Sequence, residues 1–421
     1  MNLPDRAEIV IIGGGAVGCG VAYSLARAGK SDILLIERAE DVGQVTTSQG
    51  AGLCGQVRSS VERIHLAMHS VATFRELQQD PEVRPDWNEV GSLRIALSER
   101  RAEELRGLET LCRKAGLEAG LISLAEAKRR WPPIDFTDVK AVLWCPSDGC
   151  MAPYAVVKSY EHQCKKMGVR FATSTAVEAI VCKNGRVEAV QTDHGRVECR
   201  YVINAAGAHA YHVAKLVGLE LPIVPVRHEY FVTAPLEGLN PHLPCFRIPE
   251  MALYGRRVPT PSFAGYPAGC GECLLLGGWE SASMHTDPRR YRLEENAPAV
   301  APDWRVLNGF EARFTQLFPQ AQGAEKTLVG KGWPTFTPDG HFILGESSRV
   351  KGLVMAGGCN AHGISGSAGI GRLLVESLLD PDPSEYVRSL TPDRFTERPW
   401  DWEEAHRQAK SIYETYYGVG F

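Results

Sequence analysis

The sequence predicts an α/β fold combined with an α+β part: a domain of parallel strands into which a mostly antiparallel β-sheet is inserted. Residues 7–37 show the pattern of a strand, a helix and a second strand. Residues 352–380 repeat the order of strand, glycine-rich turn and helix near the other end of the chain. Between them, residues 223–280 alternate as short strands with Pro- and Gly-rich loops. We therefore expect both ends of the chain to build one domain and the middle to supply the inserted sheet.

Length and composition limit the classes of protein to which the chain can belong. Its 421 residues suggest two or three domains, or two interleaved ones, at about 100–200 residues per domain. Hydrophobic residues make up 44% and charged residues 23%, which is typical of globular proteins and argues against a disordered or fibrous chain. The net charge of −4 offers no basic field for nucleic acid. No apolar run reaches the roughly 18 residues that a membrane span requires.

The N-terminal unit begins with the apolar, β-branched run AEIVII over residues 7–12. Helical periodicity follows over residues 16–28, Gly29 ends that helix, and DILLIE over residues 32–37 is a second apolar run. Strands that are apolar on both faces are typical of buried, parallel sheets. The next segment, residues 43–60, is small, polar and rich in glycine, so it is not expected in the core.

A glycine motif, Gly13-x-Gly15-x-x-Gly18, lies between this first strand and the helix. Glycines at this spacing allow the tight turn, the approach of the backbone to a pyrophosphate and close packing of helix on strand. The helix N-terminus attracts phosphate. Glu37 ends the second strand, where a carboxylate accepts hydrogen bonds from ribose hydroxyls. Together these features predict a Rossmann-like dinucleotide site; the alternative is a glycine-rich turn that binds nothing.

The remaining elements follow from periodicity, caps and turns. The pattern predicts helices over 61–80, 101–117, 121–132 and 154–168 and strands over 91–97, 201–207 and 352–358. Ser123, followed three residues later by Glu126, is typical of a capped helix start. The segment Lys183-Asn184-Gly185-Arg186 is a hairpin turn between alternating strands. The predicted domains are a dinucleotide domain of residues 1–90, 141–222 and 330–385, an inserted substrate domain of residues 91–140 and 223–329, and a C-terminal tail of residues 386–421.

The cysteines indicate a reducing compartment. Twelve of them are scattered through a chain that is long enough to bury a core without disulfides. The N-terminus has no basic segment followed by an apolar stretch and a cleavage site, so we expect a cytoplasmic protein with reduced thiols. Cys270-Gly-Glu-Cys273 is the only CxxC motif, and no second pair of ligands has a matching spacing. The sequence therefore predicts no metal site.

Further motifs follow the Gly13 motif in a fixed order. They are Thr46-Thr47-Ser48-x-Gly50-Ala51-Gly52, Asp148-Gly149-x-x-x-Pro153, Asn204-Ala205-Ala206-Gly207-Ala208, Thr337-Pro338-Asp339-Gly340 and Gly357-Gly358-Cys359-Asn360-Ala361-His362-Gly363. As a set they resemble the D-amino-acid oxidase superfamily of FAD-dependent oxidoreductases. The resemblance is strongest to the branch of dimethylglycine dehydrogenase, sarcosine dehydrogenase and sarcosine oxidase, and it covers roughly residues 7–400.

This resemblance implies a set of residues that contact FAD. The expected contacts are Gly13, Gly15, Gly18, Glu37, Arg38, Thr47, Ser48, Gln49, Gly50, Ala51, Gly52, Val177, Ala206, Gly207, Gly363, Ile364 and Gly366. The glycine motif would hold the pyrophosphate, Glu37 the ribose, and the backbone of Val177 the adenine. The helix that opens at 363–369 would point its N-terminus at the pyrimidine edge of the flavin, where its dipole stabilises negative charge on the reduced ring.

Two departures from the family pattern carry expectations of their own. Dimethylglycine and sarcosine dehydrogenases attach FAD through a histidine before an Ala-Ala-Gly segment, whereas this chain has Gln49-Gly50-Ala51-Gly52. Since an amide has no nucleophilic ring nitrogen, we expect FAD to be bound non-covalently. Those dehydrogenases also continue into a folate-binding half, and we expect this chain, which ends at Phe421, to lack it.

The expected substrate residues also come from the resemblance. His228 lies in Pro225–Tyr230, which resembles a strand that carries a substrate-facing histidine, and Tyr254 matches a substrate-facing tyrosine. An imidazole that titrates near neutral pH can accept an ammonium proton. His362 is placed near the flavin, and the catalytic set is therefore His228, Tyr254 and His362. The alternatives are a core histidine and tyrosine on a buried strand, and a histidine that stabilises its own turn.

A substrate carboxylate would need a cation. The candidates are Arg58, Arg256, Arg257 and Lys331. Soluble sarcosine oxidases use a lysine near the Thr-x-Asp segment, where this chain has Phe336.

The resemblance implies FAD-dependent oxidation of a secondary or tertiary amine, such as an N-methylated amino acid. Hydride leaves the carbon next to nitrogen for flavin N5, and the imine then hydrolyses. The electron acceptor would be O₂, a quinone or an electron-transfer protein, and a homo-oligomer is left open. One alternative is a D-amino acid or 2-hydroxy acid dehydrogenase. Another is a flavin-binding subunit of a hetero-oligomeric complex.

Overall fold

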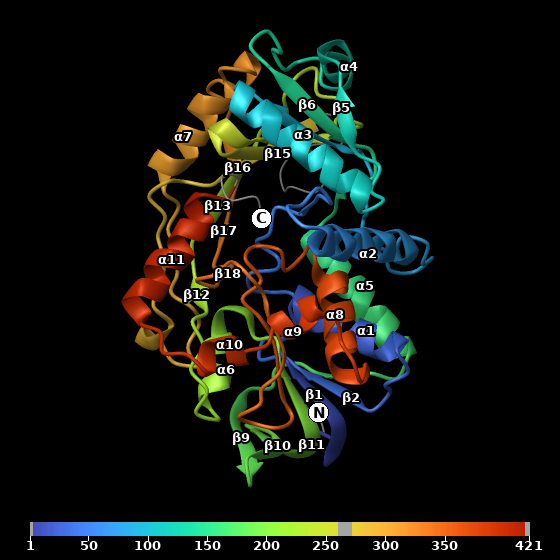
Figure 1. The fold of residues 1–421 in the computed structure, drawn as a ribbon, viewed down its shortest axis with the longest axis vertical. Coiled ribbons are helices and arrows are strands. Elements are labelled where there is room, and N and C mark those ends of the chain that lie inside the picture. Colours follow the sequence, from blue (N-terminus) through green and yellow to red (C-terminus); the bar gives the residue numbers. More distant parts are fainter. Residues whose placement is uncertain (1–2, 260–271, 417–421) are drawn as a thin grey trace.

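The computed structural model describes residues 3–259 and 272–416, which form two large β-sheets with helices around them (Figure 1). The strands of the N-terminal unit lie in the lower half of the view and the inserted strands in the upper half. The chain passes between the halves several times, as expected for an insertion.

The first sheet has the strand order β19-β20-β11-β1-β2-β8, and strands β10 and β9 extend it from β11. Its strands are β1 (Arg6–Ile12), β2 (Ile33–Ile36), β8 (Arg170–Ala172), β9 (Val177–Lys183), β10 (Arg186–Thr192), β11 (Gly195–Asn204), β19 (Ile343–Glu346) and β20 (Leu353–Gly357). Strands β20, β11, β1, β2 and β8 are parallel, which confirms the predicted parallel domain. All four residues of β2 are buried, as its unbroken apolar sequence requires.

Helices α1 (Ala16–Arg27), α5 (Pro153–Lys166) and α8 (Ser367–Leu379) pack on this sheet. Glycines bring α1 and α8 into close contact. A Cβ atom on Gly20 would lie 2.7 Å from the carbonyl oxygen of Ser367, and one on Gly371 would lie 2.6 Å from the carbonyl oxygen of Gly20. The close packing places the N-terminal ends of both helices beside one another, next to the cavity described below.

The second sheet has the order β17-β13-β16-β15-β14-β4-β6-β5 and is antiparallel except between β14 and β4. Its strands are β4 (Ser92–Ala96), β5 (Gly120–Ile122), β6 (Ala141–Cys145), β13 (His228–Thr233), β14 (Cys245–Ile248), β15 (Leu253–Pro259), β16 (Glu272–Gly278) and β17 (Lys326–Gly332). Helices α3 (Glu99–Lys114), α4 (Leu124–Arg130) and α7 (Trp304–Phe314) pack beside it. The Trp131 ring packs edge-on against Phe246 in its core. The predicted antiparallel insertion is confirmed.

Strand pairing differs from the predicted domain boundaries at two places. Strand β6 pairs with β4 in the second sheet, although residues 141–145 were expected in the dinucleotide domain. Strand β17 continues to Gly332, past the boundary expected at residue 329. Hydrogen bonding to a neighbouring strand, which can be far away in sequence, decides to which sheet a strand belongs.

Local signals predicted several details of these elements. The Ser123 side chain accepts a hydrogen bond from the Glu126 backbone and caps α4, which is shorter than the predicted helix because residues 120–122 form β5. Strands β9 and β10 form the predicted hairpin, and its turn residues Asn184 and Gly185 both have positive φ. Residues 101–117 were predicted as a helix, but α3 begins at Glu99 because Ser98 caps it.

The remaining elements lie outside the two large sheets. They are β3 (Leu53–Cys54) paired with β7 (Gly149–Cys150), β12 (Val224–Pro225) paired with β18 (Thr335–Phe336), and helices α2 (Val61–Leu77), α6 (Ala210–Lys215), α9 (Glu385–Ser389), α10 (Asp393–Thr396) and α11 (Trp402–Glu414). The segment predicted as a tail thus contains three helices, and α11 packs against β12 and β18. Across residues 3–259 and 272–416, no helix is both long and apolar enough to cross a membrane. Cys270 lies outside the described residues, and Cys273 is buried.

Candidate functional site

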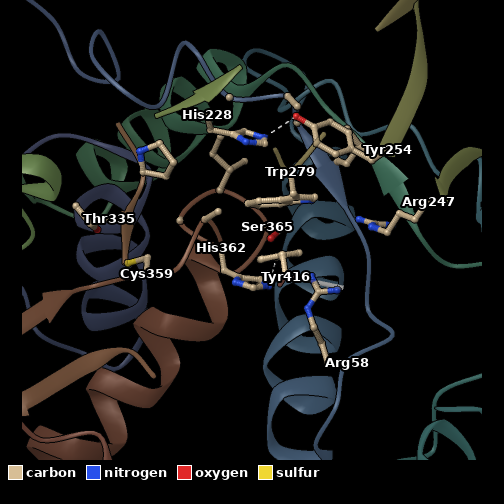
Figure 2. A pocket seen from close by; sticks show the side chains of 18 of the residues that line it. Arg58, His228, Arg247, Tyr254, Trp279, Thr335, Cys359, His362, Ser365 and Tyr416 are labelled. Carbon is tan, nitrogen blue, oxygen red and sulfur yellow. Dashed lines mark hydrogen bonds between the residues drawn. The ribbon is translucent and has the colours of Figure 1, made fainter. Parts of the chain in front are cut away.

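A cavity of about 610 Å³ lies where the two sheets meet (Figure 2). Its floor consists of the segments that follow the carboxyl ends of three parallel strands: Gly15–Val17 after β1, Ala205–Ala208 after β11, and Cys359–Ser365 after β20. In open α/β sheets, ligands bind outside these strand ends. Strands β13, β14 and β15 of the second sheet supply the opposite wall through His228, Arg247 and Tyr254.

The glycine motif has the geometry that dinucleotide binding requires. Gly13 has a φ of +110°, and a Cβ atom there would lie 2.5 Å from the carbonyl oxygen of Ala205. A Cβ atom on Gly18 would lie 1.9 Å from the carbonyl oxygen of Gly13. Helix α1 begins after Gly15 without a side-chain cap, and the Ala16 N–H donates to Thr47 Oγ1 at 3.1 Å. This uncapped helix start fits a diphosphate group.

Glu37 holds the turn together from the end of β2. Its Oε2 accepts the N–H of Gly14 at 2.7 Å, and its Oε1 accepts the N–H of Ala39 at 2.8 Å. A carboxylate has about four acceptor positions, so Glu37 retains capacity for ribose hydroxyls. The neighbouring Arg38 instead donates to the carbonyl oxygens of Leu293 and Glu295, so its guanidinium fastens that loop to the end of β2.

The structure brings about half of the expected FAD contacts to the cavity. Those that line it are Gly15, Thr47, Gln49, Gly50, Ala51, Gly52, Gly207, Gly363 and Ile364. Those that do not are Gly13, Gly18, Glu37, Arg38, Ser48, Val177, Ala206 and Gly366. The backbone of Thr175 donates to the Glu37 carbonyl oxygen at 3.0 Å, so the segment leading to Val177 lies beside Glu37, where the adenine end was predicted.

Helix α8 also starts at the cavity. Its N-cap, Gly366, provides no side-chain cap, and no acidic residue occupies the first turn, so the positive end of the helix dipole is uncompensated by side chains. The turn before it is strained: Asn360 and Ala361 have φ of +46° and +60°. The Asn360 side chain holds this turn through the Gly358 carbonyl oxygen and the Thr337 N–H. Such left-handed residues cost on the order of 1–3 kcal/mol each and are concentrated at functional sites.

His228 and Tyr254 lie together at the cavity, as predicted (Figure 2). The Tyr254 hydroxyl is 2.7 Å from His228 Nε2, and the Tyr413 hydroxyl is 3.1 Å from His228 Nδ1. The Trp279 ring stacks on the imidazole with centroids 4.5 Å apart. Burial lowers the pKa of His228 to about 3. The structure thus favours a neutral imidazole instead of the expected one that titrates near neutral pH, because the ring stack and the sheet partly bury it.

His362 is held on both sides. Its Nδ1 donates to the Asn360 carbonyl oxygen at 2.8 Å, and its Nε2 lies 3.0 Å from the Tyr416 hydroxyl. Burial and the nearby arginines lower its pKa well below the usual value. His362 thus both stabilises its turn, as one alternative predicted, and lines the cavity as a neutral imidazole.

Three aromatic residues at the site were not predicted from the sequence: Trp279, Tyr413 and Tyr416. The Trp279 and Tyr416 rings stack with centroids 3.7 Å apart, and Figure 2 shows this stack between His228 and His362. Tyr413 and Tyr416 come from the end of α11 and the residues after it. Their spacing of three residues, which within a helix would place both side chains on one face, was the available signal in the sequence.

Arginine side chains supply positive charge along one part of the cavity. Arg58, one of the four predicted cations, lines the cavity and is 8% exposed; Arg94, Arg101 and Arg247 line it as well. The other three predicted cations are engaged elsewhere: Arg256 donates to the Ala51 carbonyl oxygen, Arg257 pairs with Glu272, and Lys331 lines a separate cavity of about 800 Å³. Phe336 is fully buried and packs against Tyr413 instead of lining the cavity.

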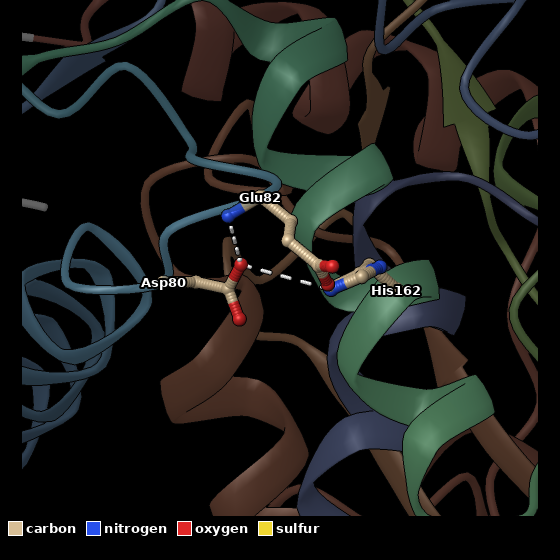
Figure 3. Close-up of side chains that lie close together, drawn as sticks. All are labelled: Asp80, Glu82 and His162. Atoms are coloured by element: carbon tan, nitrogen blue, oxygen red, sulfur yellow. Dashed lines mark hydrogen bonds and ion pairs between the residues drawn. The ribbon is translucent and has the colours of Figure 1, made fainter.

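One cluster of carboxylates and imidazole lies away from this cavity, at Asp80, Glu82 and His162 (Figure 3). Their ligand atoms lie within 4.8 Å of one another. The Lys166 ammonium, however, is 3.2 Å from a carboxylate oxygen of both Asp80 and Glu82. A lysine already neutralises these carboxylates, so the cluster joins α5 to the segment after α2 by ion pairs.

Comparison with curated proteins finds relatives along nearly the whole chain. It is 28% identical to the mitochondrial sarcosine dehydrogenase of Mus musculus over 401 residues, or 93% of this chain and 42% of that protein. It is 27% identical to the 4-methylaminobutanoate oxidase (formaldehyde-forming) of Paenarthrobacter nicotinovorans. That match covers 94% of this chain and 46% of the oxidase. It is also 27% identical to the mitochondrial pyruvate dehydrogenase phosphatase regulatory subunit of Mus musculus. That match covers 93% of this chain and 44% of the regulatory subunit. The chain thus spans less than half the length of these relatives.

Solved structures share the fold. The L-proline dehydrogenase of P. horikoshii superposes with a TM-score of 0.81 at 22% identity, covering 94% of this chain and 99% of that one. The glycine oxidase of Geobacillus kaustophilus superposes with a TM-score of 0.75 at 21% identity, and the match covers 93% of this chain and 100% of that one.

The family comparison agrees with the glycine motif, the uncapped helix starts and the cavity at the strand ends. Residues 8–377 match the DAO family, which is described as FAD dependent oxidoreductase. The chain belongs to this family of FAD-dependent oxidoreductases.

Proposed function

We propose that this oxidoreductase oxidises a secondary or tertiary amine that carries a carboxylate, such as an N-methylated amino acid. The observation that carries the proposal is the cavity itself, which combines a neutral His228–Tyr254 pair with the buried Arg58 guanidinium. An amine needs hydrogen-bonding groups that do not repel it, and a carboxylate needs a cation. The cavity lies at the helix starts that fit FAD.

Each group has a distinct role in this proposal. FAD, when bound, supplies the hydride acceptor. The His228–Tyr254 pair binds the amine and takes part in removing its ammonium proton, because hydride leaves only from the carbon next to a neutral nitrogen. The Arg58 guanidinium orients the carboxylate. The start of α8 stabilises negative charge at the cavity floor.

Two relatives support this substrate class. One is named a sarcosine dehydrogenase, and the other a formaldehyde-forming 4-methylaminobutanoate oxidase. The second name describes a methylamino group and a carboxylate in one molecule. Imine hydrolysis after oxidation of an N-methyl group gives formaldehyde, which agrees with the proposed reaction.

Anaerobic mixing of the FAD-loaded protein with a panel of amines tests this function. The panel pairs each N-methylated amino acid with its decarboxylated amine and with the 2-hydroxy acid of the same skeleton. We expect the visible absorbance of the flavin to bleach fastest with the N-methylated amino acid. If only the 2-hydroxy acid bleaches the flavin, the proposal is wrong and the protein is a 2-hydroxy acid dehydrogenase.

Replacing Arg58 with methionine should raise the KM for the carboxylated amine. A charge-assisted hydrogen bond contributes about 1.5–3 kcal/mol, which corresponds to about a 10- to 100-fold change. The decarboxylated amine should show no such change, since it lacks the group that Arg58 binds. The control is Arg196→Met, which removes an exposed guanidinium from β11. Equal effects of Arg58→Met on both amines would contradict the assignment.

FAD should be released when the protein is precipitated with acid. Gln49 lines the cavity where the dehydrogenase branch has a histidine, and an amide cannot form that covalent bond. The thiol of Cys359 also lines the cavity, but burial raises its pKa to about 12, so it is protonated and a poor nucleophile. Yellow flavin is expected in the supernatant. Flavin that stays in the precipitate would refute non-covalent binding, and Cys359→Ser would then show whether this thiol holds it.

One relative favours a second candidate function, a flavin-binding subunit of a hetero-oligomeric complex. The pyruvate dehydrogenase phosphatase regulatory subunit matches this chain as fully as the oxidase does and is named for regulation. A chain of this kind would bind FAD, but no member of the amine panel would reduce it. The panel therefore distinguishes the two candidates.

A further inference from the structure

A line of hydrogen bonds leads from the cavity into the protein interior. It starts at the Tyr254 hydroxyl, which lies 2.7 Å from His228 Nε2, and continues from His228 Nδ1 to the Tyr413 hydroxyl at 3.1 Å. The Tyr413 hydroxyl in turn donates to Glu280 Oε2. Tyr413 is fully buried and Glu280 is 8% exposed. The proposed amine site is thus connected to a buried carboxylate.

The protons along this line have only one consistent arrangement when Glu280 is ionised. A phenol carries one proton, and Tyr413 gives its proton to the carboxylate, so its oxygen accepts from His228 Nδ1–H. A neutral imidazole carries one N–H. His228 Nε2 is therefore unprotonated and accepts the O–H of Tyr254. Every donor in the line points toward Glu280.

We propose that Glu280 is the final acceptor of the proton that leaves the substrate ammonium, and that Tyr413 relays it. This rests on the proposed oxidation of an amine. The ammonium N–H bond breaks as its proton joins the Tyr254 oxygen, and the original Tyr254 proton moves to His228 Nε2. The Nδ1 proton moves to the Tyr413 oxygen, and the Tyr413 proton moves to Glu280 Oε2. The products are a neutral amine and a neutral carboxyl group, and the three residues between them keep their charge.

The surroundings of Glu280 suit a proton acceptor. Its Oε1 lies 3.6 Å from Arg227 Nη2 and has no hydrogen-bond partner within the described part of the chain. The charged groups that act on it, besides the phenol of Tyr413, are Arg227, Glu229 and Arg313, and Arg227 also pairs with Asp303. Burial, supported by Glu229, raises the pKa of Glu280 above its usual value, although Tyr413 and Arg227 oppose the shift. His228, in contrast, has a pKa of about 3 and cannot store the proton near neutral pH.

The relay predicts a pH dependence with a definite sign. Because ionised Glu280 is the acceptor, the rate of flavin reduction at saturating amine should rise with pH through the pKa of Glu280. In FAD-loaded Glu280→Gln and Tyr413→Phe, we expect this rate to fall about 10²-fold and the rise with pH to disappear. The control is Tyr211→Phe, which loses a phenol hydroxyl from a ring that packs on Trp402 of α11, at 5.2 Å between centroids. It should keep the rate and pH profile of the unmodified protein.

A second measurement does not depend on activity. The ¹⁵N shifts of the His228 ring, assigned by comparison with His228→Gln, should show the proton on Nδ1 in the unmodified protein and a changed ratio of tautomers in Tyr413→Phe. A proton on Nε2 in the unmodified protein would overturn the relay, and so would an unchanged pH profile in both variants. If no amine reduces the flavin of the unmodified protein, the amine function fails as well. If amines reduce it but the profile is unchanged, only the relay fails.

Discussion

Replacement of His228 by alanine is expected to lower the rate of flavin reduction by the amine about 10²–10⁴-fold, the range of general acid–base catalysis. The imidazole is the central member of the hydrogen-bond line, with Tyr254 on Nε2 and Tyr413 on Nδ1. Its removal leaves the ammonium proton without a route to Glu280. The visible spectrum of bound FAD should stay unchanged, because His228 lies on the second sheet, opposite the dinucleotide turn.

Matched variants separate this effect from a general loss of packing. Tyr254→Phe keeps the ring but removes the hydroxyl, so it should have a smaller effect than His228→Ala. His242→Ala changes an exposed histidine and should leave the rate unaltered. Flavin reduction at the unmodified rate in His228→Ala, measured by stopped flow with the best amine of the panel, would show that His228 only fills space.

Replacement of Gly18 by alanine is expected to abolish the retention of FAD. The added Cβ atom would lie 1.9 Å from the carbonyl oxygen of Gly13, so the start of α1 must move away from the turn that follows β1. That movement separates the two elements that form the predicted diphosphate site. The ratio of flavin to protein after gel filtration measures the effect.

Gly309→Ala is the matched control. It adds the same atom inside helix α7, where the nearest heavy atom beyond the helix backbone is 3.7 Å away. Alanine is about 0.5–1 kcal/mol more favourable than glycine within a helix, so this variant should fold and keep its FAD. A full complement of flavin in Gly18→Ala would show that the turn tolerates the movement and that the diphosphate lies elsewhere.

Features that depend on neighbours in the sequence could be predicted. The Gly13 turn, the cap at Ser123 and the hairpin at Asn184-Gly185 are each specified by a few adjacent residues, and the structure has all three. The parallel and antiparallel sheets could be predicted from apolar runs and alternation. The pairing of His228 with Tyr254 could be predicted only because the surrounding segments resemble known ones.

Features that depend on contacts between distant segments could not be predicted. Tyr413 is 185 residues from His228 in sequence, and no local pattern shows that α11 returns to the cavity. Arg247 lies on a strand of ordinary composition and reaches the cavity only because β14 pairs with β4 and β15. The low pKa of His228 has the same origin, since the rings that exclude water come from other elements.

The central claim, that the cavity oxidises an amine, is tested most directly by a single anaerobic turnover with product analysis. The FAD-loaded protein is mixed with a limiting amount of the best N-methylated amino acid, and flavin reduction and released aldehyde are both quantified. The proposed reaction predicts one aldehyde molecule for each flavin reduced, together with one demethylated amine. Flavin that stays oxidised with every amine, or that is reduced without release of an aldehyde, would contradict it.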